Sequence, residues 1–209
     1  MRMDNIIKRL VIFVEHSTSF QCMRCLNCCT PEHFGAEISY VPIYLDEVDR
    51  IRDLAAERNL EIKLEPDLMY YDELNNRLII VTYTLQLGKE GCPFHDEGCS
   101  IHKYRPITCK SYPLLVHRLG NTTGIMIKPE CAFVQQNSAK LEDLDYYDVS
   151  DVFSDEFRFA REIQIKGNAI TDQIEQLEAD GKIKVPVKVP VKITEETKTM
   201  DKIRLDAIT

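Results

Sequence analysis

The stretch Cys22-Met23-Arg24-Cys25-Leu26-Asn27-Cys28-Cys29 places four thiols within eight residues. Cysteines two residues apart can turn both sulfur atoms toward one metal ion, because the loop between them curls into a knuckle. Cys28 and Cys29 are adjacent, and neighbouring side chains of an extended chain point to opposite sides. We therefore expect one of this pair to face a second metal, to bridge within a larger cluster or to be a spare thiol.

The other four cysteines lie in residues 88–131, a segment in which glycine and proline repeatedly interrupt regular structure. Such a segment cannot build a large apolar core by itself, which is the usual reason for a metal or covalent staple. We expect both stretches to converge on a metal, with the thiolate as the ligand form. The predicted metal ligands are all the cysteines of the chain: Cys22, Cys25, Cys28, Cys29, Cys92, Cys99, Cys109 and Cys131.

Two kinds of metal centre suit these thiols. The Cys-x2-Cys-x2-Cys opening matches the first three ligands of a bacterial ferredoxin-type cluster. The match ends there, because the next ligand of a ferredoxin follows several residues later and precedes proline, whereas Cys29 directly follows Cys28. Eight soft ligands favour an iron–sulfur cluster, such as 4Fe-4S, over Zn²⁺. Zinc held by four thiolates would be structural, because it keeps no position open for substrate. The spacing leaves open one four-cysteine site, two such sites, or disulfides.

Several residues near the cysteines have side chains that suit a metal centre. Arg24 and Arg105 lie between cysteines, where positive charge lowers thiol pKa values and offsets the negative charge of a thiolate site. His95 and His102 are possible nitrogen ligands or hydrogen-bond donors. Tyr112 is expected to shape the surrounding loop and exclude water, which tunes the properties of a metal.

The first half of the chain predicts strands around one helix. Residues 6–14 are rich in β-prone side chains and could form a strand. Apolar residues recur every three or four positions from Ile43 to Leu60, which predicts an amphipathic helix, and Pro42 suits its start. Met69–Tyr71 and Leu78–Thr84 are expected to pair as a hairpin.

The second half predicts a further hairpin and a long helical region. Leu114–Leu119 and Thr123–Ile127 are expected to pair across a Gly-Asn turn. Residues 154–179 have helical periodicity, although Gly167 weakens the middle enough to allow two helices. The following Val-Lys alternation, interrupted by two prolines, suits an extended edge strand or a polyproline stretch.

Together these elements predict an α+β protein with an irregular, metal-stapled core, short strands, one early helix and one or two late helices. The 209 residues, 44% of them hydrophobic, suit one domain with appendages. We expect a metal-binding domain at 1–135, a helical extension at 136–181 and an extended basic tail at 182–209.

Charge and hydropathy narrow the expected partners and location. Lys and Arg number 26 against 34 Asp and Glu, and the resulting net charge of −8 disfavours general nucleic-acid binding. The apolar run Leu10–Val14 is too short for a secretory signal, and no stretch is long enough for a membrane span. We expect a cytoplasmic protein, with any protein partner docking through the C-terminal helix and tail.

The cysteine pattern resembles one family, the YkgJ-like CxxCxxCC zinc- or iron-chelating proteins, often described as containing iron–sulfur clusters. The resemblance covers about residues 20–131. Its remaining motifs are Cys92-Pro93-Phe94, Cys99-Ser100-Ile101-His102 and Arg105-Pro106-Ile107-Thr108-Cys109-Lys110-Ser111-Tyr112-Pro113. Relatives often have Tyr in place of His102 and Arg in place of Lys110.

The resemblance implies metal binding more firmly than any reaction, and we expect a metal-cluster protein with a redox or accessory role. One branch of the family looks like flagellin lysine methyltransferases, so a protein-lysine N-methyltransferase with a structural or sensing cluster is an alternative. A zinc-stapled interaction module is another. The sequence has no glycine-rich S-adenosylmethionine loop, Ser–His–Asp order, Walker loop or Rossmann fingerprint, and it assigns no catalytic residue.

Overall fold

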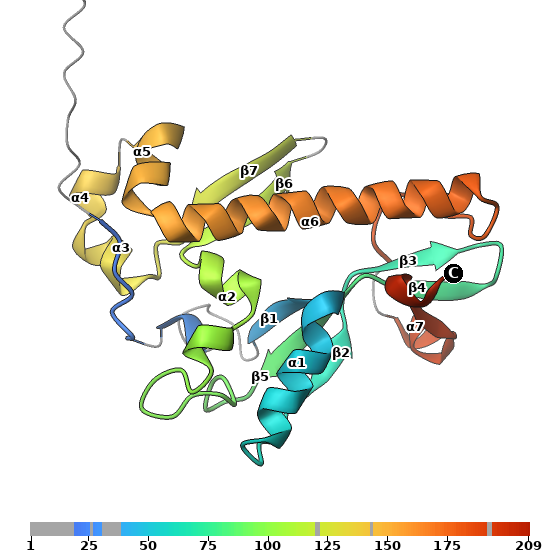
Figure 1. The fold of residues 1–209 in the computed structure, drawn as a ribbon, viewed down its shortest axis with the longest axis horizontal. Coiled ribbons are helices and arrows are strands. Elements are labelled where there is room, and N and C mark those ends of the chain that lie inside the picture. Colours follow the sequence, from blue (N-terminus) through green and yellow to red (C-terminus); the bar gives the residue numbers. More distant parts are fainter. Residues whose placement is uncertain (1–18, 26, 31–38, 120–121, 143, 192–193) are drawn as a thin grey trace, which may run out of the picture.

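The computed structural model describes residues 19–25, 27–30, 39–119, 122–142, 144–191 and 194–209. The strand predicted at 6–14 lies outside these residues. Helices and strands alternate irregularly along the chain, which confirms the α+β class (Figure 1).

The first sheet lies under the early helix. Its strands are β1 (Ser39–Tyr44), β5 (Thr82–Leu87) and β2 (Leu64–Pro66), in the antiparallel order β1-β5-β2. Helix α1 (Leu45–Ala56) buries Val48, Ile51 and Leu54 in the core cluster of this sheet. The predicted helix therefore begins later than expected.

Pro42 explains part of that difference. It lies inside β1 opposite Thr84, not at a helix start, so the predicted role of Pro42 was wrong. A proline is tolerated there because β1 is an edge strand. Ile43 and Tyr44 pair with β5 as well, and these pairings delay the helix to Leu45.

The second sheet has the order β3-β4-β8. Strands β3 (Met69–Asp72) and β4 (Arg77–Ile80) form the predicted hairpin, and β8 (Lys202–Arg204) adds to β4 in parallel. The predicted second strand of the hairpin is divided at Val81, because the chain leaves this sheet there and enters β5 of the first sheet.

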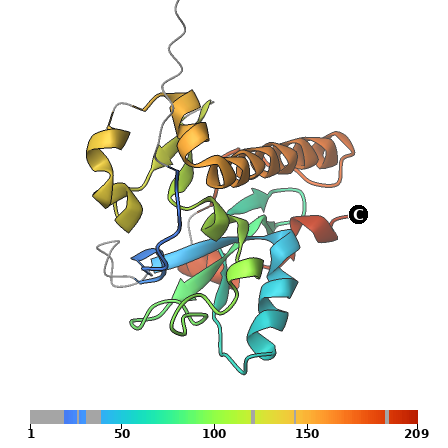
Figure 2. The ribbon, with the colours of Figure 1, turned by 60° about the vertical axis from the view of Figure 1, so that its left-hand side comes forward.

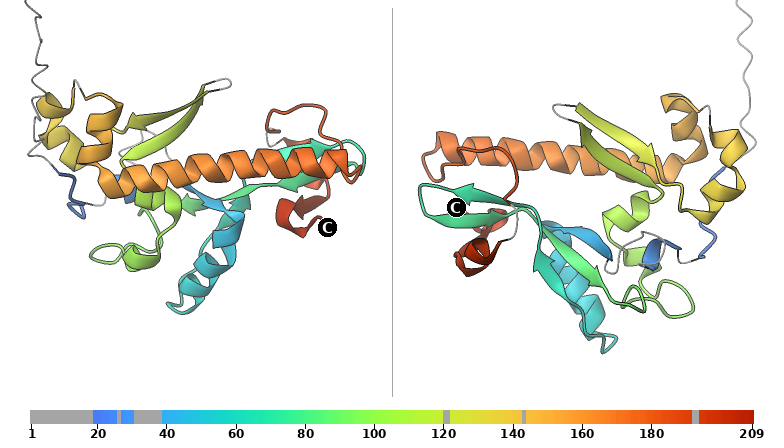
Figure 3. Two further views of the ribbon diagram at one scale, coloured as in Figure 1. Left: turned by 45° about the horizontal axis from the view of Figure 1, so that its top comes forward. Right: turned by 180° about the vertical axis from the view of Figure 1, so that it is seen from behind.

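The long helix α6 (Ser154–Ala179) connects the two ends of the molecule. Figure 3 shows it lying along the body, near the β6–β7 hairpin at one end and the β3–β4 hairpin at the other. Strands β6 (Leu114–Leu119) and β7 (Thr122–Ile127) pair as predicted. Gly167 does not interrupt α6, so the region forms one helix.

Short helices gather at the N-terminal end of α6. They are η1 (Asn27–Cys29), η3 (His102–Tyr104), α2 (Ile107–Ser111), α3 (Ala132–Gln136), α4 (Ser138–Leu141) and α5 (Tyr146–Val152). Figure 2 shows the first cysteine run, in blue, beside the yellow α3 and near β1. The fold thus brings the first run and the later cysteine segments to one end of the molecule.

The C-terminal segment contains structure that the sequence did not predict. It includes α7 (Glu195–Thr199), β8 and η4 (Leu205–Ala207), and it contributes buried Ile183, Val185 and Leu205 to the core beneath α6. No helix in the described ranges is both long and apolar enough to cross a membrane.

Candidate metal centre

The first cysteine run is anchored at its beginning by an aromatic side chain. The ring of Phe20 lies 5.0 Å from that of Phe133 and 5.3 Å from that of Phe153, between centroids. Its backbone N–H donates to the carbonyl oxygen of Val152 at 2.7 Å. The run then turns through Arg24, whose φ of 51° is in the left-handed region that few side chains other than glycine adopt. This anchor places the run beside α3.

The Cys28–Cys29 pair lies in η1, with the two sulfur atoms 3.8 Å apart. The hydrogen bond between them lowers the pKa of Cys28 to about 7, an effect that burial opposes and the positive charge of Arg105 supports. The same hydrogen bond and burial raise the pKa of Cys29. Cys28 is therefore the thiol of this pair that ionises first.

A close backbone contact joins the first cysteine run to the second. The N–H of Cys92 donates to the carbonyl oxygen of Cys29 at 2.8 Å. Gly91 makes this approach possible: its φ is +99°, and a Cβ atom there would lie 2.6 Å from the Cys29 oxygen. The contact requires glycine because any side chain would collide with that backbone.

The loop from Cys92 to Cys99 closes around a buried ring. Phe94 is 2% exposed, and its carbonyl oxygen accepts hydrogen bonds at 2.9 Å from both the N–H and the hydroxyl of Ser100. The N–H of His102 donates to the carbonyl oxygen of Cys99 at 3.1 Å. These bonds hold the two cysteines on one compact loop.

Helix α2 carries Cys109 and is fixed by the distant N-terminal half of the chain. The N–H of Ile107 donates to Oε1 of Glu47 at 2.9 Å, and the hydroxyl of Thr108 donates to the carbonyl oxygen of Pro42 at 2.8 Å. Burial raises the pKa of Glu47, while the bonds from Ile107 and Arg50 oppose that rise. The two acceptors that hold α2 therefore belong to α1 and β1.

Cys131 precedes α3 and is 6% exposed. The side-chain amide of Asn27 donates to the carbonyl oxygen of Glu130 at 3.3 Å, which joins this segment to η1 as well. The first cysteine run thus has direct hydrogen bonds to the segments of both Cys92 and Cys131.

The charges of the thiols act on one another across all these segments. Burial raises the pKa of Cys92 to about 11 and also raises those of Cys99, Cys109 and Cys131, and ionised Cys28 adds to each rise. Cys25 acts on Cys131, and Cys22 acts on Cys99. Negative charge on Cys28 therefore opposes ionisation of all four later cysteines.

The side chains do not themselves form a finished coordination sphere. All eight cysteines are free thiols, and Cys22 and Cys25 are exposed. Within the described residues, no three His, Cys, Asp or Glu side chains lie in an arrangement that could hold a metal ion. The metal-stapled core thus remains a prediction, as does ligation by each cysteine. Of the two candidate histidines, His95 is exposed and His102 is half-buried.

Unpartnered polar atoms test whether a metal–thiolate group fits this neighbourhood. Within the described chain, six buried side-chain nitrogen or oxygen atoms lack a hydrogen-bond partner. Apart from Glu47, they belong to residues beside the cysteines: Thr30, His102, Arg105, Tyr112 and Glu130. Hydroxyl and guanidinium donors suit the sulfur atoms of an anionic centre, and the eight thiols supply soft ligands. The residues present therefore fit such a group.

Sequence reasoning did not assign structural roles to Glu47 or Asn27. Their hydrogen-bond partners are 60 and 103 residues away in sequence. Local spacing contains no signal for contacts this distant.

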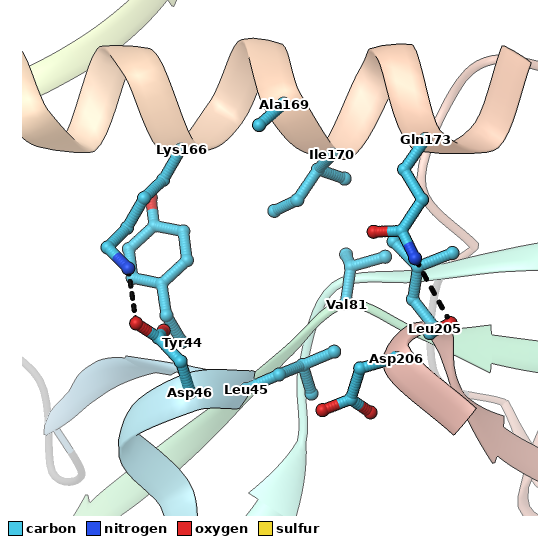
Figure 4. A pocket seen from close by; sticks show the side chains of 10 residues that line it. All are labelled: Tyr44, Leu45, Asp46, Val81, Lys166, Ala169, Ile170, Gln173, Leu205 and Asp206. Atoms are coloured by element: carbon cyan, nitrogen blue, oxygen red, sulfur yellow. Dashed lines mark hydrogen bonds and ion pairs between the residues drawn. The ribbon is translucent and has the colours of Figure 1, made fainter. Parts of the chain in front are cut away.

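A separate hollow of about 210 Å³ lies between α6, the start of α1 and η4 (Figure 4). Its polar groups pair with one another: Nζ of Lys166 lies 2.5 Å from Oδ2 of Asp46, and the Gln173 amide donates to the carbonyl oxygen of Leu205 at 3.5 Å. The lining residues are Tyr44, Leu45, Asp46, Val81, Lys166, Ala169, Ile170, Gln173, Leu205 and Asp206. The hollow contains no cysteine and is distinct from the candidate centre.

Comparison with curated proteins finds no match, and comparison with solved structures finds none either. A family match does exist, and it extends over residues 21–132, which is more than half of the 209 residues. This range includes every cysteine of the chain. The chain therefore belongs to the CxxCxxCC family, described as "Putative zinc- or iron-chelating domain".

Proposed function

We propose that this protein binds an iron–sulfur cluster through its cysteines and has a redox or accessory role. The observation that supports the proposal is that hydrogen bonds join the first cysteine run to the segments of Cys92 and Cys131, from Cys92 N–H to Cys29 and from Asn27 to Glu130. Family membership supports metal binding at the coarser level of zinc or iron. The proposed ligands are drawn from Cys22, Cys25, Cys28, Cys29, Cys92, Cys99, Cys109 and Cys131.

Iron–sulfur chemistry is preferred to zinc for two reasons. The Cys-x2-Cys-x2-Cys opening matches the first three ligands of a bacterial ferredoxin-type cluster. Unpartnered donors beside the thiols also suit the additional sulfur atoms of a cluster. A bound cluster would supply reversible one-electron transfer, with a potential that depends on hydrogen bonds to its sulfurs and on exposure.

The proposal assigns a different role to each of three parts of the chain. Residues 1–135 would hold the metal, 136–181 would support it as a helical extension, and 182–209 would form the tail. The C-terminal helix and tail would be the surface for any protein partner. A cytoplasmic location agrees with thiols that must stay reduced to act as ligands.

The direct test is elemental analysis of the full chain purified without exposure to air. We expect a brown protein that contains iron and acid-labile sulfide in comparable amounts. A colourless protein with stoichiometric zinc would contradict the iron–sulfur proposal and indicate a zinc site instead. A protein that contains neither metal, even after reconstitution with iron and sulfide or with zinc, would contradict metal binding.

A further inference from the structure

We infer that Arg204, near the end of the chain, is a positioning residue for the distant segment that bears Cys109. Arg204 holds the first turn of α1, and α1 in turn holds α2 through the carboxylate of Glu47. The consequence for bound metal rests on the proposed function, whereas the link from Arg204 to α2 does not. The C-terminal tail thereby supports the candidate centre, a role separate from that of a surface for partners.

The guanidinium of Arg204 joins the C-terminal segment to the start of α1. Its Nη2 donates to the carbonyl oxygen of Leu45 at 3.2 Å, across 159 residues of sequence, and its Nη1 lies 3.5 Å from Oδ2 of Asp49. The carboxylate of Asp206 accepts from Nε at 3.0 Å and from Nη2 at 2.7 Å. Two parallel bonds to one carboxylate fix the orientation of a guanidinium, so Nη2 is held against the Leu45 oxygen.

The backbone of Arg204 is fixed as well. Arg204 is the last residue of β8 and lies opposite Ile80 in the parallel pairing with β4. The next residue, Leu205, is 1% exposed in the core beneath α6. The guanidinium therefore extends toward α1 from a rigid part of the molecule.

Apolar packing provides a second link between the same two segments. Leu45, the first residue of α1, packs against the core cluster that contains Leu205. Leu45 and Met200 also pack against the cluster that contains Ile80. Leu45, Leu205 and Asp206 line the hollow drawn in Figure 4. The start of α1 is thus embedded in residues from the end of the chain.

A further contact to the first turn of α1 comes from α6, where Nζ of Lys166 lies 2.5 Å from Oδ2 of Asp46. The side chain of Asp46 is 61% exposed, and that of Asp49, which pairs with Arg204, is 71% exposed. Ion pairs open to water contribute little to stability. The bond from Arg204 to the main-chain oxygen of Leu45 is therefore the contact on which the role depends.

Glu47 connects the first turn of α1 to α2. It lies two residues after Leu45, and its buried Oε1 accepts the N–H of Ile107 at 2.9 Å. Hydrogen bonds weaken as they lengthen, so a shift of this turn either moves α2 or weakens that bond. The bond from Thr108 to Pro42 holds α2 independently. Loss of the Arg204 contact should therefore loosen α2 without releasing it.

The experiment compares Arg204→Met with Arg52→Met in the full-length protein, purified without exposure to air. Methionine keeps an apolar stem at both positions, and Arg52 is the matched control because it pairs with the same Asp49, at 3.3 Å, from within α1. Deuterium uptake is measured by mass spectrometry over α2 and over α3, a second five-residue helix beside a cysteine.

We expect Arg204→Met to speed the uptake over α2 by about threefold or more relative to Arg52→Met, with no matching change over α3. In metal-loaded protein, a chelator should also remove the metal about threefold faster from Arg204→Met than from Arg52→Met. Arg204→Lys keeps the charge but cannot hold Asp206 and Leu45 with the same fork, so it should recover part of both effects.

The outcomes distinguish this role from the proposed function. Wild-type protein that binds no metal would remove the proposed function, and deuterium uptake by the purified chain would still test the link from Arg204 to α2. Equal uptake over α2 in Arg204→Met and Arg52→Met would overturn the link. So would a rise of equal size over α2 and α3, because a general loss of stability affects both helices. If Arg204→Met does not fold, Arg204→Lys replaces it, and uptake over α2 equal to that of wild type would overturn the link.

Discussion

The carboxylate of Glu47 accepts a hydrogen bond from the backbone N–H of Ile107 at 2.9 Å, across 60 residues of sequence. Glu47 is 6% exposed and lies in the first turn of α1, whereas Ile107 begins α2, two residues before Cys109. A buried carboxylate is therefore used to hold a cysteine-bearing helix. The position of the segment that bears Cys109 depends on the packing of α1 as well as on its own loop.

Replacement of Glu47 should therefore damage the metal centre from a distance. Glu47→Ala leaves the Ile107 N–H buried without an acceptor and should lower the free energy of unfolding by about 2 kcal/mol. It should also lower the metal content. Glu47→Gln retains an acceptor oxygen, so it should lose less stability and less metal than Glu47→Ala. Urea unfolding and metal analysis measure these effects, with the exposed Glu57→Ala as control; equal behaviour of Glu47→Ala and Glu57→Ala would contradict the role.

Gly91 allows a second test, because replacement by alanine should have opposite effects on stability at Gly91 and at Gly167. Gly91→Ala would place a Cβ 2.6 Å from the Cys29 oxygen at a φ of +99°, so it should separate the two cysteine runs. We expect a loss of about 2 kcal/mol or more in stability, together with most of the bound metal. Gly167→Ala in α6 meets no atom within 4 Å and should stabilise the helix by about 1 kcal/mol. Thermal unfolding compares the two, and full metal binding by Gly91→Ala would show that the contact is dispensable.

The two cysteine stretches can be tested separately with one substitution in each. Cys25→Ser and Cys109→Ser each remove one proposed ligand and should each lower the metal content of anaerobically purified protein. Met23→Ser is the matched control, since Met23 is 47% exposed in the same run and supplies no thiol. Full metal content in both cysteine variants would show that the ligands lie elsewhere among the cysteines.

Local patterns predicted much of the fold. Helical periodicity gave α6 with the observed bounds, and alternation with turn residues gave the β3–β4 and β6–β7 hairpins. These elements depend on neighbours in sequence, which explains the agreement. The parallel pairing of β8 with β4 was not predicted, because it joins residues more than one hundred positions apart and no local pattern encodes such a pairing.

The features of the candidate site were likewise predicted where they depend on local sequence and missed where they depend on distant contacts. Cysteine spacing identified the CxxCxxCC family, which the match over residues 21–132 confirms. Spacing did not reveal the Cys29–Cys92 contact that Gly91 permits, the support from Glu47, or the unpartnered hydroxyl of Tyr112. Each of these depends on how separate segments pack. A single sequence lists the residues but does not show which of them contact one another.

One of the contacts that hold the tail to the body is made by a buried carboxylate. Asp72 is fully buried and accepts hydrogen bonds from the Asn75 amide at 2.7 Å, from Nε of Arg77 at 3.1 Å and from the N–H of Lys184 at 3.0 Å. Burial alone would raise the pKa of Asp72, but these bonds outweigh it and hold the pKa below its ordinary value of 3.8. The ionised form is therefore the one that the fold requires.

A lowered native pKa makes this contribution depend on pH with a definite sign. The stabilisation is complete above the unfolded-state pKa of 3.8 and is lost as the pH falls through the lower native value. Asp72→Asn should therefore cost about 2 kcal/mol at neutral pH, and its deficit relative to wild type should shrink in acid. Urea midpoints across that range measure the difference, with the exposed Asp53→Asn as control for lost charge. A deficit of constant size at every pH would mean that the carboxylate of Asp72 is not held ionised by these bonds.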